Sequence, residues 1–196
     1  MAITSRVELA ELSSQFLPEP VPYAVLTPEI TEARPLPLCL LLMGGGGSRQ
    51  TLVDCKPLFE LWWSEGGVAP MVLATPSPGM SYYVEDPAAG VRWESFVLQD
   101  FIPRLRNNCN VDAERRATAV TGISMGGLGA LKIAFTHPEE FACVAAMNPM
   151  MEPGFRDDQI GARNRLHHSD LVCDKIDQRR GDRETGRGNH LRPGAD

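Results

Sequence analysis

The sequence has few cysteines and no long apolar run, and each shortage excludes a class of protein. Its five cysteines are odd in number and show no C-x-x-C spacing, so neither a disulfide framework nor a zinc site is expected. No apolar run approaches the roughly eighteen residues of a membrane span. The N-terminal segment carries Glu8 and Glu11 where a secretory leader has a basic and then an apolar stretch. We therefore expect no membrane association and a cytoplasmic location.

Positive charge is also scarce. The chain has 19 Lys and Arg against 25 Asp and Glu, a net charge of −6, and no sustained basic helix, so no nucleic-acid partner is expected. The adjacent pair His167 and His168 is no metal motif, because neighbouring side chains on regular structure point in diverging directions. We expect neither a metal nor an organic cofactor.

The most informative segment that is present is TAVTGISMGGLGALKIAFT, residues 118–136. A short β-branched run leads into Gly122-Ile123-Ser124-Met125-Gly126, and a stretch with helical spacing follows at once. A strand, a sharp turn at G-x-S-x-G and a helix are typical of a nucleophile elbow. Gly122 and Gly126 leave room for the turn, and the amide N–H of Met125 lies at a helix N-terminus, where it can donate to an oxyanion. The alternative is a serine that only caps the helix.

A second segment fits the first. The apolar run PLCLLLM, residues 37–43, predicts a buried strand that leads into four glycines and Ser48. Glycines let the backbone approach a ligand closely, so Gly45 is our candidate for a second oxyanion N–H. A plain turn is the alternative. A phosphate loop is disfavoured, because Arg49 and Gln50 stand where Gly-Lys-Ser/Thr is needed.

The remaining pattern alternates predicted strands with predicted helices. The strands are expected at residues 22–28, 37–43, 69–76, 117–121 and 141–147, and the helices near residues 51–65, 93–107 and 125–136. Such alternation predicts an α/β fold, with a mainly parallel sheet covered by helices on both faces.

Several segments, in this order, resemble the esterase family of α/β-hydrolases, which includes esterase D (S-formylglutathione hydrolase), feruloyl esterases and mycolyltransferases. They are LLLMGGGGS, Ser81-Tyr82-Tyr83, the stretch from Trp93 to Pro103, and GISMGGLGALKIAFTHPEEFACVAAMNP. The resemblance covers about residues 20 to 160, and SMGGxGAL followed by His-Pro and Phe-Ala is its specific part.

The resemblance implies an α/β-hydrolase fold and roles for particular residues. Ser124 would be the nucleophile, and the N–H groups of Gly45 and Met125 would form the oxyanion hole. Tyr82 and Trp93 would line a substrate pocket, although aromatic side chains more often belong to the core.

The C-terminal part of the chain differs from the family and from the rest of the sequence. Residues 161–196 hold eight Lys and Arg against six Asp and Glu, and residues 1–160 hold eleven against nineteen. We expect a hydrolase domain over residues 1–162 that lacks the last strands of the family, as in a truncated or frame-shifted gene. Residues 163–196 would form a polar, basic and disordered tail.

The general base is the open question. His137 ends the predicted helix before Pro138, where a structural role at the helix dipole is expected. By resemblance His190 would be the base, with Asp182 or Asp174 as the orienting acid. The alternative is that these residues are solvated and have no role.

We expect a serine carboxylesterase that hydrolyses short-chain esters through an acyl-enzyme on Ser124, with a small-molecule ester as its partner. The alternatives are an impaired fragment that binds or self-associates without turnover, and an acyltransferase or thioesterase of the same family. Because the strand at residues 141–147 would be left at a sheet edge, we also expect a homo-oligomer with an interface near residues 141–175.

Overall fold

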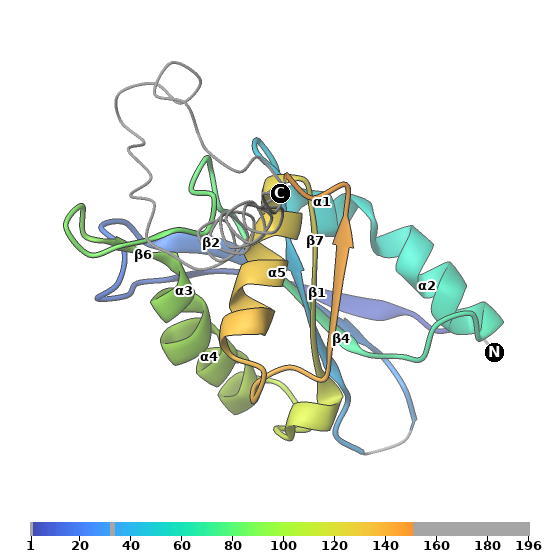
Figure 1. The fold of residues 1–196 in the computed structure, drawn as a ribbon. Helices are drawn as coiled ribbons and strands as arrows, with labels where there is room; N and C mark the ends of the chain where they lie inside the picture. Colours follow the sequence, from blue (N-terminus) through green and yellow to red (C-terminus); the bar gives the residue numbers. More distant parts are fainter. Residues whose placement is uncertain (1, 32–33, 151–196) are drawn as a thin grey trace, which may run out of the picture. The chain divides into compact units, whose positions relative to one another are not determined.

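The computed structural model describes residues 2–31 and 34–150, and its central element is a six-stranded, mostly parallel sheet (Figure 1). The strands lie in the order β1-β2-β4-β3-β7-β8. Their bounds are β1 Ser5–Leu12, β2 Val21–Pro28, β3 Leu38–Leu42, β4 Val72–Pro76, β7 Thr118–Ile123 and β8 Cys143–Met147. Strands β4, β3, β7 and β8 are parallel, and β2 runs antiparallel to both β1 and β4. The predicted α/β class is confirmed.

The register of the parallel strands brings three chain segments to one edge of the sheet. Leu42 is level with Gly122 across β3 and β7, and Ile123 is level with Met147 across β7 and β8. The segments that follow these strands therefore leave the sheet side by side. This carboxyl edge is the usual place for ligands in open α/β sheets.

Helices cover both faces of the sheet, as the sequence predicted. Helices α1 and α2 lie on one side in Figure 1, and α3, α4 and α5 lie on the other. Their bounds are α1 Arg49–Asp54, α2 Lys56–Glu65, α3 Trp93–Ser95, α4 Ile102–Asn108 and α5 Met125–Thr136, with the π-helix η1 Phe96–Phe101 between α3 and α4. A short hairpin, β5 Glu85–Asp86 and β6 Val91–Arg92, and the 3-10 turn η2 Arg115–Ala117 complete the elements of this part of the chain.

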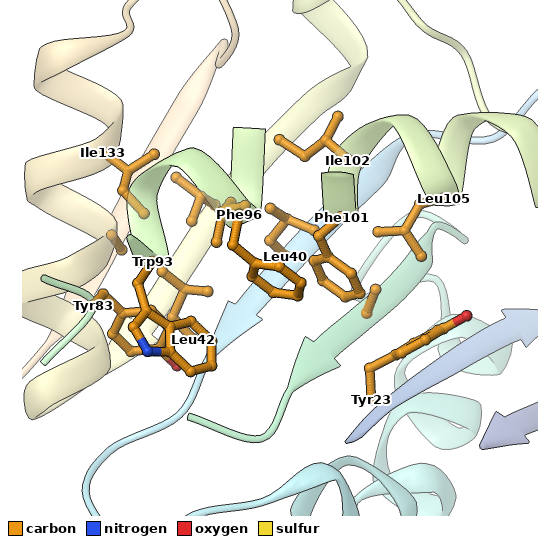
Figure 2. Close-up of a cluster of buried hydrophobic side chains, with 14 of the residues drawn as sticks. Tyr23, Leu40, Leu42, Tyr83, Trp93, Phe96, Phe101, Ile102, Leu105 and Ile133 are labelled. Carbon is orange, nitrogen blue, oxygen red and sulfur yellow. The ribbon is translucent and has the colours of Figure 1, made fainter. Parts of the chain in front are cut away.

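Alternate residues of the buried strands supply two separate hydrophobic clusters. In β3, Leu38, Leu40 and Leu42 point to the side of α5, and Cys39 points to the side of α1 and α2. The larger cluster contains Tyr23, Phe96 and Phe101 together with residues of α4 and α5 (Figure 2). Two cores on opposite faces are what a buried parallel sheet requires.

Two of the predicted helices are interrupted at prolines. The stretch 51–65 divides at Cys55, because Pro57 in the first turn of α2 has no N–H for a bond to the preceding turn. The stretch 93–107 widens into η1 just before Pro103, where the Ile102 N–H donates to the Val97 carbonyl. Helix α5 has the predicted bounds, residues 125–136.

Strand β1 is a real omission of the sequence-based prediction. Its sequence SRVELAEL is rich in Glu, Leu and Ala, which favour helices, and its pairing with β2 from Ser5 to Leu12 overrides that preference. The predicted domain boundary at residue 162 and the predicted tail lie outside the described residues, so they stay predictions.

Candidate active site

Ser124 occupies the turn between β7 and α5 with a backbone conformation that side chains rarely adopt. Its φ is 53° and its ψ is −118°. Three hydrogen bonds hold this backbone: the Ser124 N–H donates to the Met147 carbonyl at 3.0 Å, and the Ser124 carbonyl accepts from Leu128 and Met150, each at 3.1 Å. The surroundings thus enforce a strained turn, a feature that clusters at functional sites.

The glycines on either side of Ser124 are required by space. A Cβ built on Gly122 would overlap the carbonyl of Gly126, and one on Gly126 would overlap the carbonyl of Leu42. A Cβ on Gly44 would lie 3.3 Å from the Cβ of Ser124. Strand β3 and helix α5 therefore come into direct backbone contact at this turn, and the loop after β3 passes close to Ser124.

The hydroxyl of Ser124 does not cap the helix. Ser124 is the N-cap residue of α5, yet its side chain makes no capping hydrogen bond, and the residue is exposed. The capping interpretation raised by the sequence is therefore not supported. An exposed hydroxyl at a helix N-terminus is free to meet a carbonyl group.

The glycine loop after β3 is an ordered turn. The Gly47 N–H donates to the Gly44 carbonyl at 3.0 Å, Gly46 has a φ of +79°, and the hydroxyl of Ser48 accepts from the Gln50 N–H at the start of α1. Gly45 lies within this turn, and Gly44 before it lies beside the elbow. Met125 begins α5, and the first N–H groups of a helix have no partner within it.

A third segment, residues 78–84, ties the elbow to the glycine loop. The Tyr82 N–H donates to the Met125 sulfur at 3.3 Å, and the buried Tyr83 hydroxyl donates to the Met43 carbonyl at 3.2 Å. The Tyr83 ring also packs on Gly129, where a Cβ would lie 2.6 Å from a ring carbon. Burial raises the pKa of Tyr83 above its usual range, so the hydroxyl stays a hydrogen-bond donor.

Backbone strain gathers around Ser124. Within the described residues the non-glycine positions with positive φ are Tyr82, Tyr83, Ser124 and Asn148. Tyr82 and Tyr83 contact the elbow helix, and Asn148 directly follows the residue that accepts from Ser124. Sequence reasoning missed this signal, because Tyr rarely adopts a positive φ, and Asn adopts one more often but at too few positions for the residue type alone to predict it.

The two aromatic residues expected to contact substrate lie in different surroundings. Tyr82 is half-buried beside Met125. Trp93 is only 7% exposed and packs edge-to-face on Tyr83 and Phe96, with ring centroids 5.6 and 5.4 Å apart (Figure 2). Its ring is thus part of the hydrophobic core, and the substrate-lining roles of Trp93 and Tyr82 stay predictions.

Of the four histidines, only His137 lies among the described residues, and it is far from Ser124. It ends α5, a helix of twelve residues and hence about 18 Å long. Its Nε2 atom lies 2.9 Å from Glu94 Oε1, and its Nδ1 atom lies 3.2 Å from Glu139 Oε1. The expected structural role of His137 fits this environment. The candidate base and acid, His190 and Asp182, lie outside the described residues, as do His167, His168 and Asp174.

A mostly parallel sheet with helices on both faces and a strained serine turn at its carboxyl edge is the arrangement typical of the α/β-hydrolase fold. The chain belongs to the esterase family, because the family model described as "Putative esterase" matches residues 14–174.

Solved structures with the same fold include a ferulic acid esterase, with a TM-score of 0.67 and 24% identity over 79% of this chain and 63% of that chain. An S-formylglutathione hydrolase from Agrobacterium tumefaciens has a TM-score of 0.65 and 22% identity over 76% of this chain and 60% of its own.

Curated relatives match a shorter part of the chain. The diacylglycerol acyltransferase/mycolyltransferase Ag85A of Mycobacterium tuberculosis is 30% identical over 106 residues, which is 50% of this chain and 30% of the relative. The esterase MT1326 of Mycobacterium tuberculosis is 28% identical over 121 residues, 59% of this chain and 26% of the relative. The matched region thus spans about three-tenths of the length of these relatives. Over the part of the chain that the structure describes, no helix has the length and apolar character needed to cross a bilayer.

Proposed function

We propose that the chain is a serine carboxylesterase that hydrolyses short-chain esters through an acyl-enzyme on Ser124. The observation that carries the proposal is the exposed, uncapped hydroxyl of Ser124 on a strained turn that backbone hydrogen bonds enforce. Membership of the esterase family supports an ester as substrate.

In this mechanism the Ser124 oxygen attacks the ester carbonyl carbon while its proton passes to a general base. The N–H groups of Gly45 and Met125 would donate hydrogen bonds to the oxyanion of the tetrahedral intermediate. These bonds would stabilise the negative charge that develops on the carbonyl oxygen. The bond to the alcohol oxygen then breaks, and the alcohol leaves with the proton from the base. Water attacks the acyl-enzyme in the same way and releases the acid and Ser124.

The experiment is steady-state hydrolysis of p-nitrophenyl acetate by the wild type and by Ser124→Ala. We expect the variant to lose at least about a thousandfold in kcat/KM, since it loses the covalent step. Ser13→Ala, which removes another exposed serine hydroxyl in the loop after β1, is the matched control and should keep full activity. Equal turnover by Ser124→Ala and the wild type would refute the proposal.

We further propose His190 as the general base, with Asp182 as its orienting acid, on the basis of the family resemblance alone. His190→Ala should lower kcat at least about a hundredfold, the lower range for general acid–base catalysis. His137→Ala is the matched control, because its ring lies at the distant end of α5. If His190→Ala has no more effect than His137→Ala, the base is another group.

The relatives named acyltransferases favour a second candidate, transfer of the acyl group to an acceptor other than water. The two functions share the acyl-enzyme on Ser124 and differ in what attacks it. Product analysis with added alcohol, sugar or thiol acceptors separates them: transfer predicts an acylated acceptor, and hydrolysis predicts free acid only.

We also propose that copies of the chain associate near β8. Among the described strands β8 forms the edge of the sheet opposite to β1, and Met147 and Ile123 beside this edge are 55% and 45% exposed. These two side chains border an apolar cavity of about 230 Å³ on the α1 face. Light scattering at micromolar concentration should give the mass of a dimer or larger species, and a monomer would refute the proposal.

A further inference from the structure

Met80 is a large apolar side chain that lies against the tip of the glycine loop. It is 55% exposed, yet a Cβ built on Gly45 would lie 2.8 Å from its sulfur and 3.3 Å from its terminal methyl carbon. The thioether therefore contacts the α-carbon of Gly45. Gly45 is the residue whose N–H we propose as an oxyanion donor.

The loop that carries Met80 is held in place by hydrogen bonds to two other segments of the candidate site. Gly79 before it has a φ of +56°, which favours glycine. After it, Tyr82 donates to the Met125 sulfur and Tyr83 donates to the Met43 carbonyl. Met80 thus starts from a backbone that is tied to the elbow helix and to the end of β3.

The proposed oxyanion role of Gly45 would place a bound ester next to this thioether. A carbonyl oxygen that accepts from the Gly45 N–H must come within about 3 Å of that nitrogen. A group attached to the same carbonyl then lies within van der Waals reach of a side chain that touches the Gly45 α-carbon. A thioether is flexible and polarisable, so it adapts to apolar groups of different shape.

We propose that Met80 is a specificity-determining residue that contacts the apolar chain flanking the ester carbonyl. The inference rests on the proposed esterase function. The hydrocarbon chain that Met80 contacts belongs either to the acyl group or to the alcohol of the ester, and both are apolar.

The kinetic test compares wild type and Met80→Ala on two ester series. One series lengthens the acyl group from p-nitrophenyl acetate to butyrate to hexanoate, and the other lengthens the alcohol of alkyl acetates. Loss of the contact should change the long-to-short ratio of kcat/KM about five- to twentyfold in one series, mainly through KM. The series whose ratio changes identifies which part of the ester Met80 contacts.

Leu61→Ala, which truncates a 51% exposed side chain on α2, is the control and should leave both ratios unchanged. Unchanged ratios in both series for Met80→Ala would overturn the proposal.

A binding measurement separates this proposal from the failure of the esterase mechanism, because it needs no turnover. Ser124→Ala is oxidised with hydrogen peroxide with and without p-nitrophenyl hexanoate, and methionine sulfoxide is mapped by mass spectrometry. Met71, which is half-buried just before β4 and packs in the cluster on the α1 and α2 side of the sheet, serves as the internal reference. The ester should slow oxidation of Met80 at least threefold and leave the oxidation rate of Met71 unchanged, and a Met80 rate that the ester does not change would overturn the proposal.

Discussion

Helix α5 begins and ends in two very different environments. At its start, Ser124 is held at a φ of 53° between glycines that no other residue could replace. At its end, His137 and Lys132 surround the carboxylate of Glu94, at 2.9 and 3.5 Å. The first end has a strained backbone next to an exposed serine, and the second end has ion pairs between partly exposed side chains. Both ends carry residue types that enzymes use, and we propose a catalytic role for the first end alone.

The largest effect should come from removing space at the start of the helix. In Gly126→Ala the new methyl group would overlap the Leu42 carbonyl, and both partners are backbone that cannot move away. We expect a loss of at least about 3 kcal/mol in the free energy of unfolding, measured by urea denaturation. Gly67→Ala is the matched control, because the nearest atom to its Cβ lies 3.8 Å away. Equal stability of the two variants would contradict the steric account.

A smaller effect should follow from loosening the glycine loop. Tyr83→Phe keeps the buried ring and leaves the Met43 carbonyl without its 3.2 Å hydrogen bond. An unsatisfied buried carbonyl costs about 1–3 kcal/mol in stability. Because Met43 directly precedes the loop, kcat on p-nitrophenyl acetate should fall with little change in KM. A stability loss with unchanged kcat would show that Tyr83 supports the core and not the site.

The far end of the helix should tolerate change. Glu94→Gln removes the charge that His137 and Lys132 share, and these side chains are partly exposed. We expect less than about 1 kcal/mol of lost stability and unchanged kcat/KM. A tenfold drop in kcat/KM would contradict the claim that the C-terminal end of α5 does not affect activity.

The smallest effect concerns two thiols, Cys39 in β3 and Cys143 in β8. Burial, together with the nearby Cys143, raises the pKa of Cys39 to about 11, whereas Cys143 itself is exposed. At pH 8 Cys39 is then almost entirely the neutral thiol, and its thiolate forms only as the pH approaches 11. Iodoacetamide at pH 8 should modify Cys143 and spare Cys39, as mapped by mass spectrometry, with no loss of activity from the Cys143 adduct. Modification of Cys39 at the same rate would contradict its burial.

Local sequence patterns predicted the parallel strands and α5, because buried strands and the elbow leave strong signals in the apolar run at 37–43 and in G-x-S-x-G. The helix interruptions near Pro57 and Pro103 could have been predicted, since each proline removes a backbone donor. Strand β1 could not have been predicted, because its pairing with β2 comes from the tertiary fold.

The site was predictable only in part. The glycines around Ser124 follow from the chemistry of a sharp turn, and the structure gives each of them a steric reason. The positive φ of Tyr82 and Tyr83, the burial of Trp93 and the position of Met80 over Gly45 depend on contacts between segments far apart in sequence. No local pattern encodes such contacts.

The most direct test of the account is covalent labelling with a fluorophosphonate, which reacts with an activated serine hydroxyl. The wild type should take up one phosphonyl group, and peptide mapping by mass spectrometry should place it on Ser124. Prior incubation with an ester substrate should slow the labelling. Stoichiometric labelling at another residue, or ester hydrolysis by a protein whose Ser124 stays unmodified under saturating reagent, would contradict the claim that Ser124 is the nucleophile.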